Sequence, residues 1–428
     1  MSRFQRARIR GLLAVIGCLV ILAGCGTSIG PKTQIQGPPG PTGPYDTPQN
    51  VAAYQQAISG FLSASSKNKV QALLFPVLTP SNPTFNDFMT SILPNISGVS
   101  VSMPWSEIET SQGNYDFSLF DASLQPYEAA GAQVNLIVWP ATEGGNNDPN
   151  SVGSTPAYVF TPQWASSVGA LNPQDMAVCA SYTGDSSNPF YSEAASGSGG
   201  GMWNINTSGD LSGLPVSYEL PFMIAYQKFI AQVVAHYNGN AATPIGYIRF
   251  GFSQGGEDSP ECNQYWPGYS ETVYLTYVGT MTNVIKAQNP SMTILADLHA
   301  VGPPGSVDYT YPDTEAADAV ADGFGIGTNG LQQSDAASVS ANQPCDSNWC
   351  ALFSQYSGRG LTLSLQTLQW SDPTDVLQTG SLATLNGTEG LIPLAQAHGA
   401  NNLELYLADV ALAFSSDYCN YPHAVCGP

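Results

Sequence analysis

The segment from residue 245 to 261, IGYIRFGFSQGGEDSPE, decides how the rest of the chain is interpreted. Its first part, Gly246–Phe252, has the composition of a short buried strand. Gly255 and Gly256 then permit a sharp turn, because glycine adopts backbone angles that strain other residues. Glu257 follows at once, so we expect its carboxylate at the carboxyl end of the strand. The alternative is that the residues after the strand form a solvated acidic loop.

Apolar runs separated by helical periodicity recur along the chain. Runs such as LLFPVL and VNLIVW are apolar on both sides, as expected of parallel strands covered by helices. The predicted strands are Val70–Leu78, Gly98–Met103, Gln133–Trp139, Gly246–Phe252, Met292–Asp297, Gly323–Gly327, Leu361–Thr367 and Asn402–Leu407. The predicted helices are Val51–Ser63, Leu119–Ala130, Pro221–Tyr237, Glu271–Gln288, Thr314–Ala321 and Leu382–His398.

This alternation predicts the α/β class, with a single (β/α)8 TIM barrel whose functional face is formed by the carboxyl ends of the strands. The alternative is an open doubly wound sheet. The absence of a glycine-rich phosphate motif after the first strand disfavours it.

The composition argues against some functions. Hydrophobic residues make up 43% of the 428 residues, enough for a large core. Acidic residues number 32 against 11 basic ones, and four of the basic residues lie in the first 24 positions, which hold no acid. The rest of the chain therefore sets 7 basic groups against 32 acidic ones, a formal charge of −25. Such a surface repels phosphate, so we expect no nucleic-acid partner.

The first 24 residues have a basic start and an apolar run, as in a secretory signal. The run ends in Leu-Ala-Gly-Cys and resembles a bacterial lipobox with Cys25 as the lipidated residue, although an ordinary signal peptide is the alternative. Residues 25–50 contain GPPGPTGP and predict a flexible tether, before one barrel domain over 51–428. We therefore expect an exported lipoprotein of the bacterial cell envelope, at the outer membrane or cell surface, held to the membrane by a lipid anchor.

One predicted connection, at about 140–220 after the third strand, is far longer than the usual loop of about 4–6 residues. It is rich in Gly, Ser and Asn and carries scattered aromatic residues, among them Phe160, Trp164 and Tyr218. Such rings suit stacking on sugars. The alternative is that they pack the insertion onto the barrel.

Six cysteines remain beyond the leader and Cys25, and an even number in an exported chain favours disulfides. The preferred pairs are Cys345–Cys350, Cys419–Cys426 and Cys179–Cys262. The first two close short loops, and the third would fix the insertion beside Glu257. A zinc site is the alternative, but there is no CxxC motif and only His423 lies near a cysteine pair. We expect no metal and no cofactor.

The segment VSMPWSEIETSQGNYDFSLFDASLQPYEAAGAQVNLIVWP resembles the retaining glycoside hydrolases with a TIM barrel, such as beta-galactosidases. Their pattern is a Trp, a Glu-Pro-like pair, a Gly, an aromatic-Asp-aromatic step and a helix ending in Ala-Gly. The matching residues are Trp105, Glu109-Thr110, Gly113, Tyr115-Asp116-Phe117 and Ala130-Gly131. With the strand spacing, the resemblance covers Val70–Phe414.

The resemblance implies two carboxylates about 5–5.5 Å apart. The acid/base follows the fourth strand, where this chain has Glu257, in a Gly-Gly-Glu setting in place of the usual Asn-Glu pair. The nucleophile ends the seventh strand, where alternation turns Thr362, Ser364 and Gln366 inward. Gln366 then occupies the nucleophile position, and an amide cannot attack as a carboxylate does.

Other carboxylates are candidates for that role. They are Glu404, which shares the inward face of the last strand with Tyr406, Asp297 at the end of the fifth strand, and, for an inverting mechanism, Glu143 or Asp409. Alternatively, Glu404 and Asp297 are buried carboxylates paired with Arg249, because burying an unpaired charge is costly.

We therefore expect a lipid-anchored glycoside hydrolase acting on a polysaccharide or oligosaccharide, with Glu257, Glu404 and Asp297 as catalytic candidates. The expected substrate-binding residues are Trp105, Glu109, Trp139, Glu143, His299, Gln366, Trp370 and Tyr406. One alternative is a non-catalytic glycan-binding protein on the same fold, which Gln366 favours. Another is a structural or adhesion lipoprotein whose barrel is only a scaffold.

Overall fold

The computed structural model of the chain describes most of the predicted barrel domain. The described residues are 47–74, 77–141, 160–170, 176–177, 214–253, 256, 258, 268–298, 310–331, 349–367, 371, 380–382 and 390–421. The predicted signal, the tether and most of the insertion lie outside these ranges.

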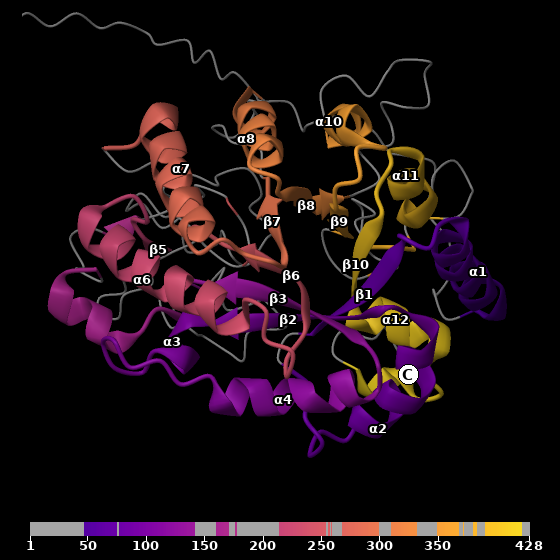
Figure 1. Cartoon of the computed structure of the whole chain (residues 1–428). Coiled ribbons are helices and arrows are strands. Elements are labelled where there is room, and N and C mark those ends of the chain that lie inside the picture. The colour runs from indigo at the N-terminus through magenta and orange to yellow at the C-terminus, as the bar shows by residue number, and fades with distance from the viewer. Residues whose placement is uncertain are drawn as a thin grey trace, which may run out of the picture. The chain divides into compact units, whose positions relative to one another are not determined.

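Eight parallel strands close into a barrel in the order β1-β10-β9-β8-β7-β6-β3-β2 (Figure 1). Their bounds are β1 Lys69–Leu74, β2 Gly98–Pro104, β3 Gln133–Trp139, β6 Ile245–Phe250, β7 Thr293–Asp297, β8 Gly325–Leu331, β9 Leu363–Thr367 and β10 Asn402–Tyr406. The first and last strands pair directly, with Gln71 opposite Glu404. The predicted (β/α)8 fold and its eight strands are therefore confirmed, and the open sheet is excluded.

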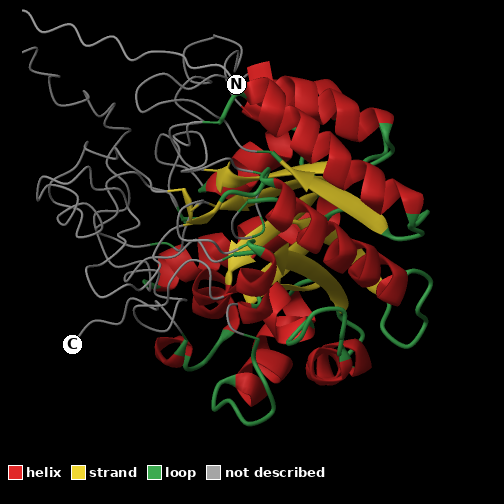
Figure 2. Ribbon diagram, turned by 90° about the vertical axis from the view of Figure 1, so that its left-hand side faces the viewer, coloured by secondary structure: helices red, strands yellow, loops and turns green. Residues whose placement is uncertain are grey.

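Helices surround the strands (Figure 2). The α-helices are α1 Pro48–Ala64, α2 Phe85–Asp87, α3 Trp105–Ile108, α4 Ser118–Ala129, α6 Leu220–Tyr237, α7 Glu271–Ala287, α8 Thr310–Ala321, α10 Trp349–Tyr356, α11 Leu391–Ala397 and α12 Leu407–Phe414. A π-helix, Phe88–Ile92, and 3-10 turns at Leu93–Asn95, Gln163–Val168 and Tyr418–Asn420 complete the helical segments, and β4 Met176–Ala177 pairs antiparallel with β5 Leu214–Pro215.

Three helices near the end of the chain differ from prediction. The predicted helix Leu382–His398 is shortened to α11, because Gly390 precedes it with a φ of 73°, outside the helical region. The short helices α10 and α12 were not predicted. The last strand ends at Tyr406, and α12 follows it without a loop.

The two faces of the strands differ in chemistry, and β2 shows this most clearly. Its sequence GVSVSMP alternates, and Val99, Val101 and Met103 belong to the large apolar core cluster that includes the helices. The intervening Ser100 hydrogen-bonds to Tyr247 on β6 inside the barrel. Because side chains alternate along a strand, one polar set is held inside the barrel while the apolar set packs against the helices.

Among the described residues, no helix combines the length and apolar character needed to cross a bilayer. Cys419, in the turn Tyr418–Asn420, is disulfide-bonded. Its expected partner, Cys426, lies outside the described residues, as do Cys179, Cys262 and Cys345.

Candidate functional site

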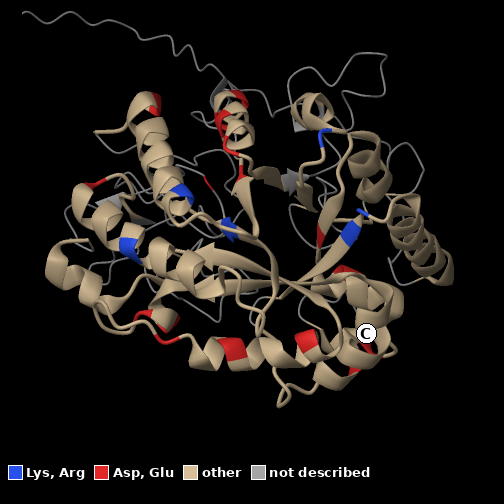
Figure 3. Cartoon of the chain, in the orientation of Figure 1, with Lys and Arg blue, Asp and Glu red and all other residues tan. Residues whose placement is uncertain are grey.

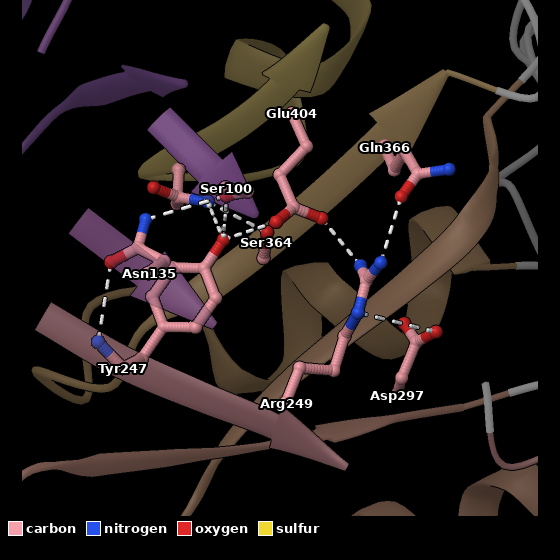
Figure 4. A network of polar contacts seen from close by, with 9 residues as sticks. Ser100, Asn135, Tyr247, Arg249, Asp297, Ser364, Gln366 and Glu404 are labelled. Carbon is pink, nitrogen blue, oxygen red and sulfur yellow. Dashed lines mark hydrogen bonds and ion pairs between the residues drawn. The ribbon is translucent and has the colours of Figure 1, made fainter. Parts of the chain in front are cut away.

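The barrel interior is unusually polar. Residues paired in register on neighbouring parallel strands face the same side, so the pairing defines the inward set. Among the inward residues, the polar side chains that contact one another are Ser100, Asn135, Tyr247, Arg249, Asp297, Ser364, Gln366, Asn402 and Glu404 (Figure 4). Bulky branched side chains usually fill such a barrel. Here a connected polar network occupies that space.

Arg249 on β6 is the centre of the network, and only 2% of it is exposed. Its Nη1 donates to Oε2 of Glu404, and its Nη2 donates to Oε1 of Gln366 at 2.9 Å. Its Nε lies 3.9 Å from Oδ2 of Asp297. One guanidinium therefore faces two carboxylates, and the alternative that both acids pair with Arg249 is confirmed.

Tyr247 connects this charged group to the neutral part of the network. Its hydroxyl donates to Oε1 of Glu404 and lies 3.0 Å from Oγ of Ser100. Burial raises the pKa of the Tyr247 phenol well above its ordinary value. The nearby Glu404 carboxylate raises it further, while Arg249 opposes the rise. The phenol therefore stays protonated and acts as a donor to Glu404.

Three more polar side chains complete the network. The Oδ1 of Asn135 accepts from the Tyr247 backbone N–H at 3.2 Å. Asn402 Nδ2 donates to Ser364 Oγ at 2.8 Å. Alternation within β2 and β3 marks Ser100 and Asn135 as inward polar residues, so the signal for them was present in the sequence and was missed.

Gly256 covers the charged centre. A Cβ built on this residue would overlap Cγ2 of Ile137 and lie 3.1 Å from Nε of Arg249. Its backbone thus approaches the guanidinium more closely than any other residue type would allow. The sequence predicted glycine here for a turn, whereas in the structure lack of space requires it.

Asp258 is a buried carboxylate that the sequence analysis did not consider. Its backbone N–H donates to the carbonyl of Asp297 at 3.2 Å, and it forms a β-bridge with Leu298. Burial raises the pKa of its carboxyl well above the ordinary value, and a hydrogen bond from Tyr274 on α7 partly opposes this. The contact with Tyr274 directs the Asp258 side chain toward the helix layer.

Aromatic residues lie above the network, at the carboxyl ends of the strands. Trp139 and Phe160 contact each other with ring centroids 5.5 Å apart. Together with Leu73, Ile137 and Tyr406 they form a separate cluster. Phe160 and Tyr406 are partly exposed. Two of the predicted substrate-binding residues, Trp139 and Tyr406, are thus neighbours in one cluster.

Two other predicted substrate-binding residues are buried away from the mouth. Trp105 is fully buried and packs against the α6 residues Phe222, Tyr226 and Phe229. Its indole N–H donates to Glu109 at 2.8 Å. Glu109 also accepts from the Gly113 N–H, and although burial raises the pKa of its carboxyl, these hydrogen bonds oppose the rise. The pair anchors the loop after β2, and the substrate contact expected of these two residues stays a prediction.

The insertion residue Trp164 contacts the same group. Its indole donates to the Glu109 carbonyl at 2.9 Å, and its ring meets Trp105 edge-on. For this ring, the alternative of packing the insertion onto the barrel is confirmed.

Asp409 on α12 is held by two serines, and its candidate role as the distant base of an inverting mechanism stays a prediction. It is 2% exposed, and its oxygens accept from the backbone N–H groups and hydroxyls of Ser371 and Ser381. The Ser381 hydroxyl also lies 2.7 Å from the Tyr54 hydroxyl on α1. Four hydrogen bonds therefore hold Asp409 between Ser371 and Ser381.

Gln366 was predicted to stand where a nucleophile would be and to contact substrate. It faces inward as predicted, is 6% exposed and accepts from Arg249. The other predicted site residues, Glu257, Glu143, His299 and Trp370, lie outside the described residues. Within the described part of the chain, no group of three or more His, Cys, Asp or Glu side chains is arranged to hold a metal ion.

The closed parallel barrel and its helices define the class of fold, a TIM barrel. The chain is similar to the catalytic domain of beta-amylase from Paenibacillus polymyxa, with a TM-score of 0.52, 12% sequence identity, and coverage of 84% of this chain and 98% of that one. It is also similar, at a TM-score of 0.43 and 8% identity, to xylanase 10B from Thermotoga petrophila RKU-1 in complex with xylobiose, over 82% of this chain and 84% of that one. No family model and no curated protein matches the sequence. At this identity the amylase likeness concerns the fold alone.

Proposed function

We propose that this protein is a glycoside hydrolase acting on a polysaccharide or oligosaccharide at the mouth of the barrel, with Glu257 as general acid/base. The observation that carries the proposal is the position of its two sequence neighbours. Gly256 lies against Arg249 inside the barrel, and Asp258 is bonded to the end of β7 with its side chain toward α7. Both neighbours of Glu257 therefore lie at the carboxyl ends of β6 and β7, the face on which such barrels carry their functional residues, and this supports Glu257 as the acid/base candidate.

Asp297 is the preferred second carboxylate. It ends β7, and its backbone carbonyl accepts directly from the segment that holds Glu257. Its Oδ2 lies 3.9 Å from Nε of Arg249. Glu404, by contrast, is fully buried and accepts from both Arg249 and Tyr247, so its assignment to catalysis is the weaker one.

The aromatic cluster at the mouth supports a carbohydrate ligand. Sugar rings offer apolar C–H faces, and partly exposed Phe160 and Tyr406 beside Trp139 provide surfaces for stacking. The beta-amylase with the same fold is consistent with this chemistry.

A glycan-binding protein without turnover is the second candidate. It is favoured by the commitment of Asp297 and Glu404 to Arg249, and by an amide at Gln366. Hydrolysis needs two carboxylates free to exchange protons or attack carbon, whereas binding does not.

The deciding experiment assays a panel of polysaccharides for turnover and for binding with wild type, Glu257→Gln, Asp297→Asn and, as control, Glu107→Gln at an exposed position on α3. For hydrolysis, we expect turnover to fall at least a hundredfold in both site variants and to persist in the control, because acid/base groups contribute about 10²–10⁴-fold. Turnover unchanged in Glu257→Gln would reject the assignment. Retention of a glycan without turnover by wild type would favour the binding protein.

We further propose export with a lipid anchor at Cys25, on the strength of the signal and lipobox pattern alone. When cells are supplied with a labelled fatty acid, the wild-type chain is expected to carry the label and to be found in the membrane fraction. Cys25→Ser should abolish the labelling and the membrane association, and a labelled Cys25→Ser protein would contradict the anchor.

A further inference from the structure

A cavity lies on the helix-facing side of the barrel, between α7 and α8 and over β6 and β7, which are neighbours in Figure 1. Its volume is about 200 Å³. Three aromatic residues, Phe250, Phe252 and Phe324, contribute to its lining together with Val278 and Ile294. A cavity of about 150 Å³ holds a molecule of benzene, so this one accommodates a small organic ligand.

One lining residue is a buried carboxylate. Glu315 on α8 is only 4% exposed, and neither of its carboxylate oxygens has a hydrogen-bond partner among the residues that the structure describes. Burying a carboxylate without a partner is expensive, and a bound cation would offset that cost. Its side chain therefore marks a preference for positive charge.

The surroundings of Glu315 reinforce this preference. Acidic residues gather on α8 (Figure 3), and two of them, Asp318 and Asp322, also line the cavity. Lys286 on α7, which does not line the cavity, is ion-paired with Asp322. The local charge around the cavity is thus negative.

The α7 wall is left open by a glycine. A Cβ added to Gly279 would meet nothing within 4 Å, and Gly279 itself is exposed, so the cavity opens to solvent at this turn of α7. A larger side chain at this position would narrow the opening without displacing the backbone.

We propose that this cavity binds a small organic ammonium ion, with the ammonium group against the Glu315 carboxylate and the apolar body among the phenylalanines. The carboxylate supplies a charge-assisted hydrogen bond, and aromatic faces attract cations. This site is separate from the barrel mouth and does not depend on the function proposed above.

The test uses benzylammonium and the neutral benzyl alcohol, which have nearly the same shape, with isothermal titration calorimetry on the whole protein. Wild type is expected to bind benzylammonium about tenfold or more tightly than benzyl alcohol, because hydrogen bonds to charged groups contribute about 1.5–3 kcal/mol. Glu315→Gln should remove that preference and leave the alcohol affinity within about threefold. The control Asp313→Asn, which removes an exposed acid of α8 that does not line the cavity, should behave as wild type.

Gly279→Leu distinguishes binding in this cavity from binding at the barrel mouth. It should weaken both ligands at least tenfold while the chain stays folded, since leucine is a better helix former than glycine. Equal affinity of wild type for the two ligands, or no saturable binding of either, would overturn the proposal. So would a benzylammonium affinity that survives either Glu315→Gln or Gly279→Leu in a variant with wild-type circular dichroism.

Discussion

Replacing Arg249 with methionine tests whether the polar interior is held together by a single cation. Methionine preserves much of the length and apolar stem of arginine but supplies no hydrogen-bond donor. The change leaves Glu404 and Asp297 facing each other in a site where they are 0% and 1% exposed. The only compensating charge that contacts them among the described residues is then gone.

The expected cost follows from that count of charges. Removing one partner of a buried ion pair costs about 3–5 kcal/mol, so Arg249→Met should lose about that much unfolding free energy. Glu404→Gln removes a carboxylate instead, and leaves Arg249 facing Asp297 at balanced charge. Its cost should be nearer the value of a charge-assisted hydrogen bond, about 1.5–3 kcal/mol. The arginine variant is therefore expected to be the less stable of the two.

Urea unfolding followed by circular dichroism, with the slopes compared, measures these differences. Arg359→Met is the control, because Arg359 is exposed and its guanidinium lies 4.8 Å from the Tyr356 ring, a contact worth about 0.5–1 kcal/mol. The double variant Arg249→Met/Glu404→Gln should cost less than the sum of its parts, since the two residues interact directly. The reasoning fails if Arg249→Met costs no more than Arg359→Met, or less than Glu404→Gln.

Three further predictions concern the stability of glycine and aspartate variants, and each is tested by chemical unfolding. Gly256→Ala should destabilise by about 1–3 kcal/mol through overpacking, and less so when Ile137→Ala provides room; additive costs would contradict this. Because burial raises the pKa of Asp258 above its unfolded value of about 3.9, its stabilising contribution is complete below pH 4 and is lost as pH rises through the folded pKa. Asp258→Asn should therefore gain stability relative to wild type between pH 4 and pH 7, and a constant difference would refute this. Gly279→Ala and Gly60→Ala, both in helices with open space at Cβ, should each stabilise by about 0.5–1 kcal/mol, and a loss at Gly279 alone would show that its open space is needed.

The barrel could be predicted from the sequence because its signals are local. A strand buried on both sides needs an uninterrupted apolar run, and a covering helix needs its own periodicity, so Gln133–Trp139 was predicted with the bounds it has in the structure. The pairing of Glu404 and Asp297 with Arg249 was also raised beforehand, because so few cations are available to neutralise buried acids.

The roles of individual polar residues were less predictable. Trp105 and Glu109 follow a strand and were therefore expected at the mouth. In the structure Trp105 packs against Phe229 of α6 and donates a hydrogen bond to Glu109. Asp409 follows the last strand and was therefore considered as a catalytic carboxylate. In the structure it accepts hydrogen bonds from Ser371 and Ser381. Phe229 lies 124 residues after Trp105, and Ser371 and Ser381 lie 38 and 28 residues before Asp409, so no local pattern reports these contacts.

What the sequence determined by itself was the set of eight strands and the alternation of side chains along each one, since backbone periodicity is fixed by neighbouring residues. Only the tertiary structure decided which inward groups meet. Closing β1 against β10 brings Glu404 within reach of Arg249 and Tyr247, more than 150 residues earlier in the chain. A hydrogen bond requires contact at about 3 Å, and contact between distant segments exists only after the barrel has closed.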